Sequence, residues 1–257
     1  HETSAGQHEI DFKYAEALQA ADNIMTFRMT VKTVAQRMGM HATFMPKPVY
    51  GVNGSGMHTN MSIFKDGKNI FFDENGERKL SKEAYHFIAG LIHHVNGFAA
   101  LTNPLVNSYK RIVPGFEAPC YVAWSASNRT ALIRIPASRG NSTRVELRSP
   151  DPSCNPYLAL AACLAAGLDG IEKEMTPPDE VTGNIFQMTE KEREANGIFS
   201  LPPTLYDAIK EMEKDKLITD LLGEHITDRY VAGKMSEWNE FRTQITDWEL
   251  NKYMVIY

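Results

Sequence analysis

Two glutamates stand seven positions apart at the start of the chain, in the segment Glu2-Thr-Ser-Ala-Gly-Gln-His-Glu9. In a flat strand they would point to opposite faces, because side chains alternate with a period of two. Gly6 permits a bend that would bring them together, and converging carboxylates suit hard cations such as magnesium. The alternative is a solvated acidic loop, since glutamate is normally exposed.

A glycine-rich stretch, Asn53-Gly-Ser-Gly-Met-His58, could cradle a ligand, because glycines let the backbone approach a bound molecule closely. No Gly-Lys-Ser/Thr follows it, so it is not the phosphate-binding loop of the P-loop proteins. His58 falls on the strand that we expect next, which is a usual place for a metal ligand. A histidine with a purely structural role is the alternative.

A third segment begins at Asn107 and reads Asn-Ser-Tyr-Lys-Arg-Ile-Val-Pro-Gly-Phe-Glu-Ala-Pro. Its prolines, glycine, two cations and single carboxylate, Glu117, indicate a shaped loop. Such a loop could cover a site, as lids do. An ordinary surface loop with a Lys-Arg pair is the alternative.

Five arginines fall within twenty residues: Arg129, Arg134, Arg139, Arg144 and Arg148. On a strand, Arg144, Glu146 and Arg148 share one face and the two apolar residues between them share the other. This pattern predicts a sheet with one wet face. The clustered arginines indicate a polyanion, such as a nucleotide phosphate or an acidic substrate. A salt-bridged outer face is the alternative.

The elements that must position these residues follow from periodicity and from turn residues. Helices are predicted at 14–38, 81–101 and 156–174, with Ser81 as an N-cap, and further helices follow to the C-terminus with turns at Pro202-Pro203 and Gly223. Strands are predicted at 41–45, 57–64, 69–72, 118–126, 130–135 and 144–148, with a hairpin turn at 65–68. Hairpin-sized gaps between the strands favour an antiparallel α+β layout with a helical C-terminal region.

Composition sets limits on the class of protein. The 257 residues are 43% hydrophobic and 23% charged with a net charge of −5, which suits a soluble globular chain and does not suggest nucleic-acid binding. No run of about 18 apolar residues predicts a membrane span. Three cysteines without a CxxC spacing make a disulfide framework or zinc site improbable and favour a reducing cytoplasm. The chain opens on a functional-looking segment without a methionine, so we expect it to be part of a longer protein.

Taken together, these segments resemble the glutamine synthetase family. The most specific part is Arg111-Ile-Val-Pro-Gly-Phe-Glu-Ala-Pro followed by Tyr121-Val-Ala-Trp-Ser-Ala and Arg134-Ile-Pro. The resemblance covers nearly the whole chain and is greatest to class I, the bacterial or archaeal type. It implies a mainly antiparallel curved sheet forming an active-site half-barrel, flanked by helices. It also implies that residues 1–257 are the catalytic domain without the family's N-terminal β-grasp domain and first catalytic strands.

The resemblance implies ATP-dependent ligation of ammonia to glutamate through γ-glutamyl phosphate, with two or more Mg²⁺ or Mn²⁺ ions per site. The expected metal ligands are Glu2, Glu9, His58 and Glu146. The expected glutamate-binding residues are Asn53, Gly54, Arg111, Glu117, Arg129 and Arg148. The expected ATP-binding residues are Asn60, Ser62, Arg129, Arg134 and Arg144. Glu117, Arg129 and Arg134 would be catalytic, with Glu117 taking a proton from ammonium.

Further implications concern assembly and regulation. The family works as a cytoplasmic homo-oligomer, a dodecamer in full length, whose sites form between subunits, so we expect this stretch alone to be inactive. A regulatory protein partner is compatible with the family; nucleic acid and membrane are not expected partners. Some bacterial relatives are adenylylated at a tyrosine where this chain has Phe186, which lacks a hydroxyl. Many relatives also have a second histidine where this chain has Asn60.

Two other functions stay open at this point. One is a γ-glutamyl ligase of the same fold that acts on an amine other than ammonia, although Glu117 and its flap favour ammonia. The other is a catalytically inactive homologue with a structural or regulatory role. An inactive homologue would be expected to have lost metal ligands or arginines, whereas all those that the resemblance implies within this span are present.

Overall fold

The structure is a computed structural model that describes residues 1–128 and 130–257. At its centre is an open four-stranded sheet made of β1 (Thr59–Met61), β7 (Val145–Leu147), β6 (Ile133–Arg134) and β5 (Trp124–Ser125), in that order. β7 pairs antiparallel with both β1 and β6, whereas β5 runs parallel to β6. The predicted α+β class is confirmed, with one parallel pair inside a mainly antiparallel arrangement.

The register of this sheet separates an apolar face from a polar one. Ile133 pairs with Leu147, and both side chains are fully buried in the main core. Next to this pair, Asn60 and Arg134 both stand opposite Glu146. Directly paired residues point to the same face of a sheet, and neighbours along a strand point to opposite faces. Asn60, Glu146 and Arg134, which we call the polar row, therefore lie on the face turned away from the core.

Helices complete the core. α2 (Lys82–Thr102) packs against both α4 (Pro156–Glu172) and α6 (Leu205–Lys214). The N-cap predicted at Ser81 is confirmed, because its hydroxyl accepts a hydrogen bond from the amide of Ala84 at 3.1 Å. α2 and α4 approach so closely at Gly90 that an added Cβ there would stand 2.1 Å from the carbonyl oxygen of Ala166. A side chain at position 90 would therefore force the two helices apart.

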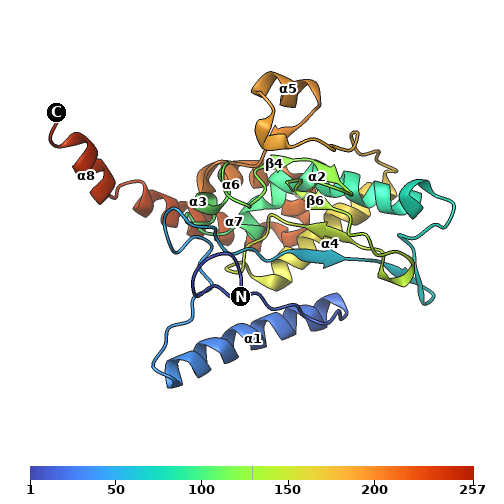
Figure 1. Ribbon diagram of the computed structural model, residues 1–257, viewed down its shortest axis with the longest axis horizontal. Coiled ribbons are helices and arrows are strands. Elements are labelled where there is room, and N and C mark those ends of the chain that lie inside the picture. The colour runs from blue at the N-terminus through green and yellow to red at the C-terminus, as the bar shows by residue number, and fades with distance from the viewer. Residues whose placement is uncertain (129) are drawn as a thin grey trace.

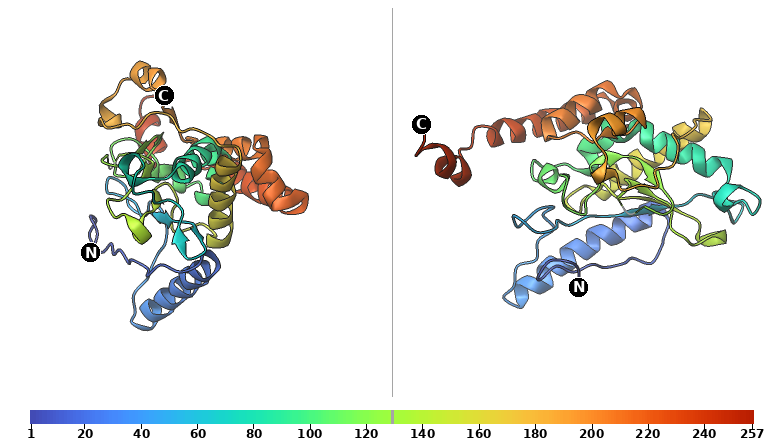
Figure 2. Two further views of the ribbon diagram at one scale, coloured as in Figure 1. Left: turned by 90° about the vertical axis from the view of Figure 1, so that its right-hand side faces the viewer. Right: turned by 45° about the horizontal axis from the view of Figure 1, so that its top comes forward.

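The other elements surround this body. They are α1 (Ala17–Arg37), α3 (Ser108–Arg111), α5 (Glu190–Ala195), α7 (Lys216–Phe241), α8 (Asp247–Tyr253), β2 (Phe64–Lys65) paired with β3 (Lys68–Asn69), β4 (Tyr121–Val122) paired with β8 (Phe199–Ser200), and the 3-10 turns η1 (Glu77–Lys79), η2 (Gly140–Ser142) and η3 (Ile185–Gln187). α1 runs along one side of the body, and α8 projects away from it at the C-terminal end (Figures 1 and 2). Among the described residues, no helix has both the length and the apolar character that a membrane crossing requires.

Several predicted strands are wrong or shorter than predicted. Residues 41–45 form no strand, because no neighbouring segment in the described chain supplies the hydrogen bonds of a ladder. The strand predicted at 118–126 is broken at Ala123, and its two halves pair with different partners, β8 and β6. The hairpin at 65–68 is confirmed, since Asp66 and Gly67 have φ of 51° and 74°, as a type I′ turn requires. Gly223 is a kink within α7, with φ of 74°.

A buried ionic cluster connects the helices. His94 on α2 lies between two carboxylates, with Nδ1 at 2.7 Å from Asp215 and Nε2 at 3.0 Å from Asp169. Asp215 caps α7, and Asp169 on α4 also pairs with Lys173. Burial alone would lower the pKa of His94, but the hydrogen bonds to Asp215 and Asp169 outweigh it, so the pKa is raised. The imidazolium therefore joins three helices by charge.

This cluster predicts a pH-dependent stability. A histidine whose pKa is higher in the folded state than in the unfolded state stabilises the fold while it is protonated. This stabilisation is fully present below the pKa of the unfolded state, about 6.5, and is lost as pH rises through the pKa of the folded state. Replacing His94 with Gln removes the cation from between Asp215 and Asp169, of which only Asp169 keeps another cation, Lys173, and should cost about 3 kcal/mol at pH 6. Thermal unfolding followed from pH 6 to 9 should show wild type and His94→Gln converging as pH rises. The exposed neighbour His93→Gln is the matched control, and equal losses in both variants would contradict the prediction.

Candidate functional site

The polar row is organised around the carboxylate of Glu146, which is only 3% exposed. Arg134 donates from Nε to Oε2 at 2.6 Å and also pairs with the same oxygen through its terminal nitrogen. Arg148 Nε lies 3.6 Å from Oε1, and His58 Nδ1 lies 3.4 Å from Oε1. The sequence predicted a wet sheet face here. That expectation is wrong for Glu146, because the long arginine side chains cover it.

The cations around Glu146 also set the charge of His58. Burial, followed by the positive charges of Arg148, Arg111 and Arg134, lowers the pKa of His58 to about 4. The imidazole is therefore neutral at pH 7. Neutral imidazole is the form that binds a metal ion. The side chain of His58 is 35% exposed, so an ion could reach it from solvent.

The N-terminal segment folds back onto the glycine-rich loop. Gly6 has φ of 74°, and Gln7 Nε2 donates to the carbonyl oxygen of Gly54 at 3.0 Å and to the hydroxyl of Ser55 at 3.2 Å. Ser4 Oγ donates to the carbonyl of Asn53 at 3.3 Å. Gln7 was not among the residues predicted for the site. Its position between the two glutamates, next to a bend, was the only signal for this role.

This docking brings the two N-terminal glutamates together. Glu2 and Glu9 share a hydrogen bond between their carboxyl groups, which lowers the pKa of Glu2 and raises that of Glu9. Glu2 also feels the charge of His58, and Glu9 feels that of Glu146. The four expected metal ligands therefore lie on one side of the molecule, as two pairs.

These four side chains have the chemistry that a divalent cation requires: carboxylate oxygens and a neutral imidazole. Two carboxyl groups this close repel each other when both are ionised, and a cation bound between them would relieve that repulsion. No three such ligands in the described part of the chain already converge tightly enough to hold an ion. The donor set fits a metal, and the assignment of individual ligands stays a prediction.

Arg111 lies beneath the glycine-rich loop. Its guanidinium is 3% exposed and donates to the carbonyl oxygens of Ser149 at 2.7 Å and Arg148 at 3.1 Å. Burial lowers its pKa to about 10, so it remains charged. An added Cβ at Gly54 would stand 2.3 Å from the carbonyl oxygen of Pro46, which explains why this loop requires glycine.

The remaining predicted residues lie at the edge of the polar row or apart from it. Arg144 Nε donates to Asn60 Oδ1 at 3.0 Å, so these two ATP-site candidates meet. Ser62 is exposed just beyond β1. Arg139 instead binds backbone carbonyls, including that of Arg78 at 2.7 Å, which is a structural role. Arg129 lies outside the described residues.

Glu117 is exposed on a loop that we call the flap, residues 113–117. The preceding residue, Phe116, covers the ammonium of Lys47, whose Nζ stands 3.4 Å from the ring centroid. Lys47 is 9% exposed and lies at the start of the loop that carries Asn53 and Gly54. Lys47 was not among the residues predicted for the site, because a lysine between two prolines matches no known motif or periodic pattern.

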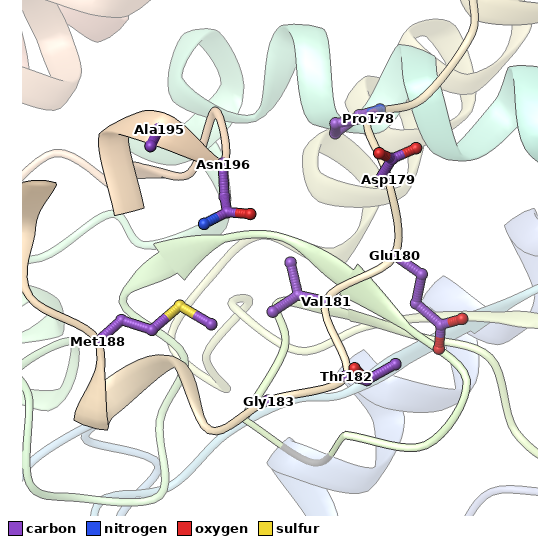
Figure 3. A pocket seen from close by; sticks show the side chains of 9 residues that line it. All are labelled: Pro178, Asp179, Glu180, Val181, Thr182, Gly183, Met188, Ala195 and Asn196. Carbon is purple, nitrogen blue, oxygen red and sulfur yellow. The ribbon is translucent and has the colours of Figure 1, made fainter. Parts of the chain in front are cut away.

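A hollow on the surface lies elsewhere. It has a volume of about 410 Å³ and lies between the segment 178–183 and α5 (Figure 3). Of its two acidic lining residues, Glu180 directs its carboxylate to the hydroxyl of Ser125 at 2.9 Å and to the guanidinium of Arg78. None of the residues predicted for the site lines this hollow, so it is not the candidate site.

Phe186, which stands where the resemblance places a tyrosine in some bacterial relatives, is partly buried. Its ring packs against that of Tyr121 with centroids 5.9 Å apart, and it borders the main core. This placement fits an apolar anchor for the loop around η3.

Comparison with known proteins identifies the family. The family model described as glutamine synthetase, catalytic domain, matches residues 1–253. The glutamine synthetase of Clostridium saccharobutylicum is 62% identical over 254 residues, which are 99% of this chain and 57% of that protein. The glutamine synthetase of Thermus thermophilus is 57% identical over 257 residues, which are 100% of this chain and 58% of that protein. The chain therefore belongs to the glutamine synthetase family and spans a little over half the length of these relatives.

Solved structures agree with this assignment. A structure described as apo GmaS without ligand has a TM-score of 0.81 at 38% identity, covering 94% of this chain and 55% of that one. A second structure, described as a GmaS/ADP complex, has a TM-score of 0.85 at 36% identity, covering 95% of this chain and 56% of that one. The fold predicted from the resemblance is confirmed at the level of the whole chain.

The Glu2–Glu9 pair leads to a prediction about cation binding. With a raised pKa, Glu9 holds its proton to higher pH than an ordinary glutamate, and a bound cation would displace that proton. Titration of the natural protein with Mn²⁺ should release protons, and its affinity should fall as pH drops. Calorimetry in buffers of different ionisation enthalpy measures both effects. Glu9→Gln should bind more weakly and release fewer protons. Unchanged proton release in this variant would remove Glu9 from the site.

Proposed function

We propose that the natural protein containing this chain is an ATP-dependent glutamate–ammonia ligase, which makes glutamine through γ-glutamyl phosphate in nitrogen assimilation. The observation that carries the proposal is the position of Glu146. A buried carboxylate stands at the centre of a sheet face, between two arginines and a neutral histidine, in a chain of the glutamine synthetase family. Relatives at 62% and 57% identity bear the name of that enzyme.

The chemistry explains why such a site is rich in positive charge. A carboxylate reacts poorly with ammonia, so its oxygen must first become a leaving group by accepting the γ-phosphoryl group of ATP. Phosphoryl transfer depends mainly on positioning and on neutralising charge. Arg134 would bind the phosphate oxygens, with Arg129 and Arg144 supporting it. Asn60 and Ser62 would contact ATP. Nucleotide binding is supported by a similar solved structure, which is described as a GmaS/ADP complex.

Glutamate would lie beside the glycine-rich loop. Asn53 and Gly54 would bind its amino group and backbone, and Arg111, Arg129 and Arg148 its carboxylates. Glu117 would close over the bound substrate, attract ammonium and take a proton from it. The acyl phosphate must be kept from water until ammonia attacks, which is the task of a flap.

Glu2, Glu9, His58 and Glu146 would hold Mg²⁺ or Mn²⁺, two or more ions per site. A divalent ion supplies charge neutralisation on the phosphates and on the departing oxygens. We assign residues 1–257 to the catalytic domain, in a longer cytoplasmic protein that works as a homo-oligomer. The family's dodecamer, with sites shared between subunits, is the arrangement that we propose.

Ammonia is the amine that the proposal specifies. The experiment is ATP-dependent product formation by the natural protein with glutamate and either ammonium or small alkylamines, with the product identified by mass. Glutamine as the main product supports the proposal. A preference for an alkylamine would make the protein a γ-glutamyl ligase of another specificity, and no ATP turnover with any amine would make it an inactive homologue.

The role of Arg134 can be tested by a substitution that keeps the charge. A guanidinium can hold two phosphate oxygens, whereas an ammonium holds one point. Arg134→Lys should therefore lower kcat by about 10²–10³, the usual cost of losing one preorganised donor. Steady-state kinetics with saturating glutamate and ammonium measure this. A near wild-type rate would refute bidentate binding by Arg134.

The role of Glu117 predicts a different kinetic change. Glu117→Ala removes the proposed base and the ammonium site together, so ammonia transfer should slow by about 10²–10⁴ while ATP binding stays close to wild type. Turnover at limiting ammonium and nucleotide affinity by calorimetry separate the two effects. If turnover at limiting ammonium were unchanged, another group would have to accept the proton.

A further inference from the structure

Lys47 is a buried cation whose charge is not matched by a carboxylate among the described residues. It is 9% exposed, its ammonium donates to the carbonyl oxygen of Val52, and its other close partner is the face of the Phe116 ring at 3.4 Å. Burial lowers the pKa of this lysine. A buried cation without an ion-pair partner is costly, so a ring that supplies compensating negative potential is favoured there.

The backbone around Lys47 is fixed. The side chain of Asn107 accepts from the amide of Lys47 at 2.8 Å and donates to its carbonyl at 3.0 Å. Asn107 immediately precedes α3, which leads into the flap. The ammonium therefore stands at a defined point between the flap, which ends at Glu117, and the loop that begins at Lys47 and carries Asn53 and Gly54.

The flap itself has few other attachments. Among the described residues, its backbone is held by a hydrogen bond from the amide of Val113 to the carbonyl of Arg111 at 3.0 Å, at the very start of the loop. Pro114 and Gly115 are exposed, and Gly115 has φ of 95°, a turn that only glycine adopts without strain. The stacking of Phe116 on Lys47 is thus a side-chain contact that ties the outer part of the flap to the body.

We infer that Lys47 is a positioning residue for Glu117: its ammonium under the Phe116 ring holds the flap against the loop carrying Asn53 and Gly54. Phe116 and Glu117 are adjacent, so fixing the ring limits where the carboxylate can lie. The inference rests on the proposed function for its consequence, which is retention of the acyl phosphate. The contact itself stands independently of that function.

Two pairs of variants test the contact. Lys47→Met keeps the length of the side chain and removes the charge, whereas Lys47→Arg keeps a cation that can stack on the ring. Phe116→Leu removes the π face and leaves the bond from Lys47 to Val52 intact, whereas Phe116→Tyr keeps the ring. The matched control is Lys110→Met, which removes an exposed cation on α3, just before the flap, whose ring partner is Phe241 at 5.1 Å from the centroid and not Phe116.

The first measurement does not depend on activity. Hydrogen–deuterium exchange of the peptide containing residues 112–119, in the natural protein, should be about tenfold faster in Lys47→Met and in Phe116→Leu, since a desolvated cation–π contact biases opening by roughly that factor. Lys47→Arg, Phe116→Tyr and the Lys110→Met control should match wild type. The double variant Lys47→Met/Phe116→Leu should be no faster than either single one. Unchanged exchange in Phe116→Leu would overturn the inference.

The second measurement connects the contact to catalysis. Phosphate released per glutamine formed should rise in Lys47→Met and Phe116→Leu, because an open flap exposes the acyl phosphate to water, and the KM for ammonium should rise with it. Thermal unfolding checks that both variants remain folded. Faster exchange with no ligase activity in wild type would sustain the contact and refute the proposed function. Normal coupling despite faster exchange would refute the role of Lys47 in positioning Glu117.

Discussion

The site depends on one buried carboxylate, Glu146, held at the centre of a sheet whose other face is the core. An isolated carboxylate at 3% exposure would be expensive, so its charge must be compensated locally. Arg134 is fixed opposite it by the strand register, and Arg148 lies two residues farther along the same strand face. The arginines are thereby oriented before any substrate arrives.

The same arrangement leaves the site positive overall. Burial, followed by the charges of Arg148, Arg111 and Arg134, lowers the pKa of His58 to about 4 and keeps it neutral, although Glu146 is in contact with it. An environment that disfavours an additional proton on a histidine also favours an incoming anion such as a phosphate or a dicarboxylate. The two N-terminal glutamates supply the opposing negative charge from a separate segment.

Much of this could be predicted from the sequence, for identifiable reasons. Alternation along 144–148 predicted that Arg144, Glu146 and Arg148 share a face, and Ser81 marked a helix start through its hydroxyl. Burial of Glu146 could not be predicted, because it depends on which residues stand opposite it on β1 and β6. The failed strand at 41–45 shows the same limit, since a strand exists only if a partner lies beside it, and partners come from distant sequence. Gln7 and Lys47 were missed because their roles are defined by contacts to residues 47 and 69 positions away, Gly54 and Phe116.

The division between sheet and loops also bears on specificity. The groups assigned to charge neutralisation, Glu146 and Arg134, are on strands, where backbone hydrogen bonds fix them closely. The groups assigned to the substrate, Asn53 and Glu117, are on loops. Sheet-borne residues suit the phosphoryl transfer that every member of such a family must perform, whereas loops can change with little effect on the core. Under the proposed function, discrimination between ammonia and larger amines would depend on the place where these loops meet. In this chain they meet at Lys47, whose buried ammonium under the Phe116 ring would limit how far the flap can shift to admit a bulkier amine.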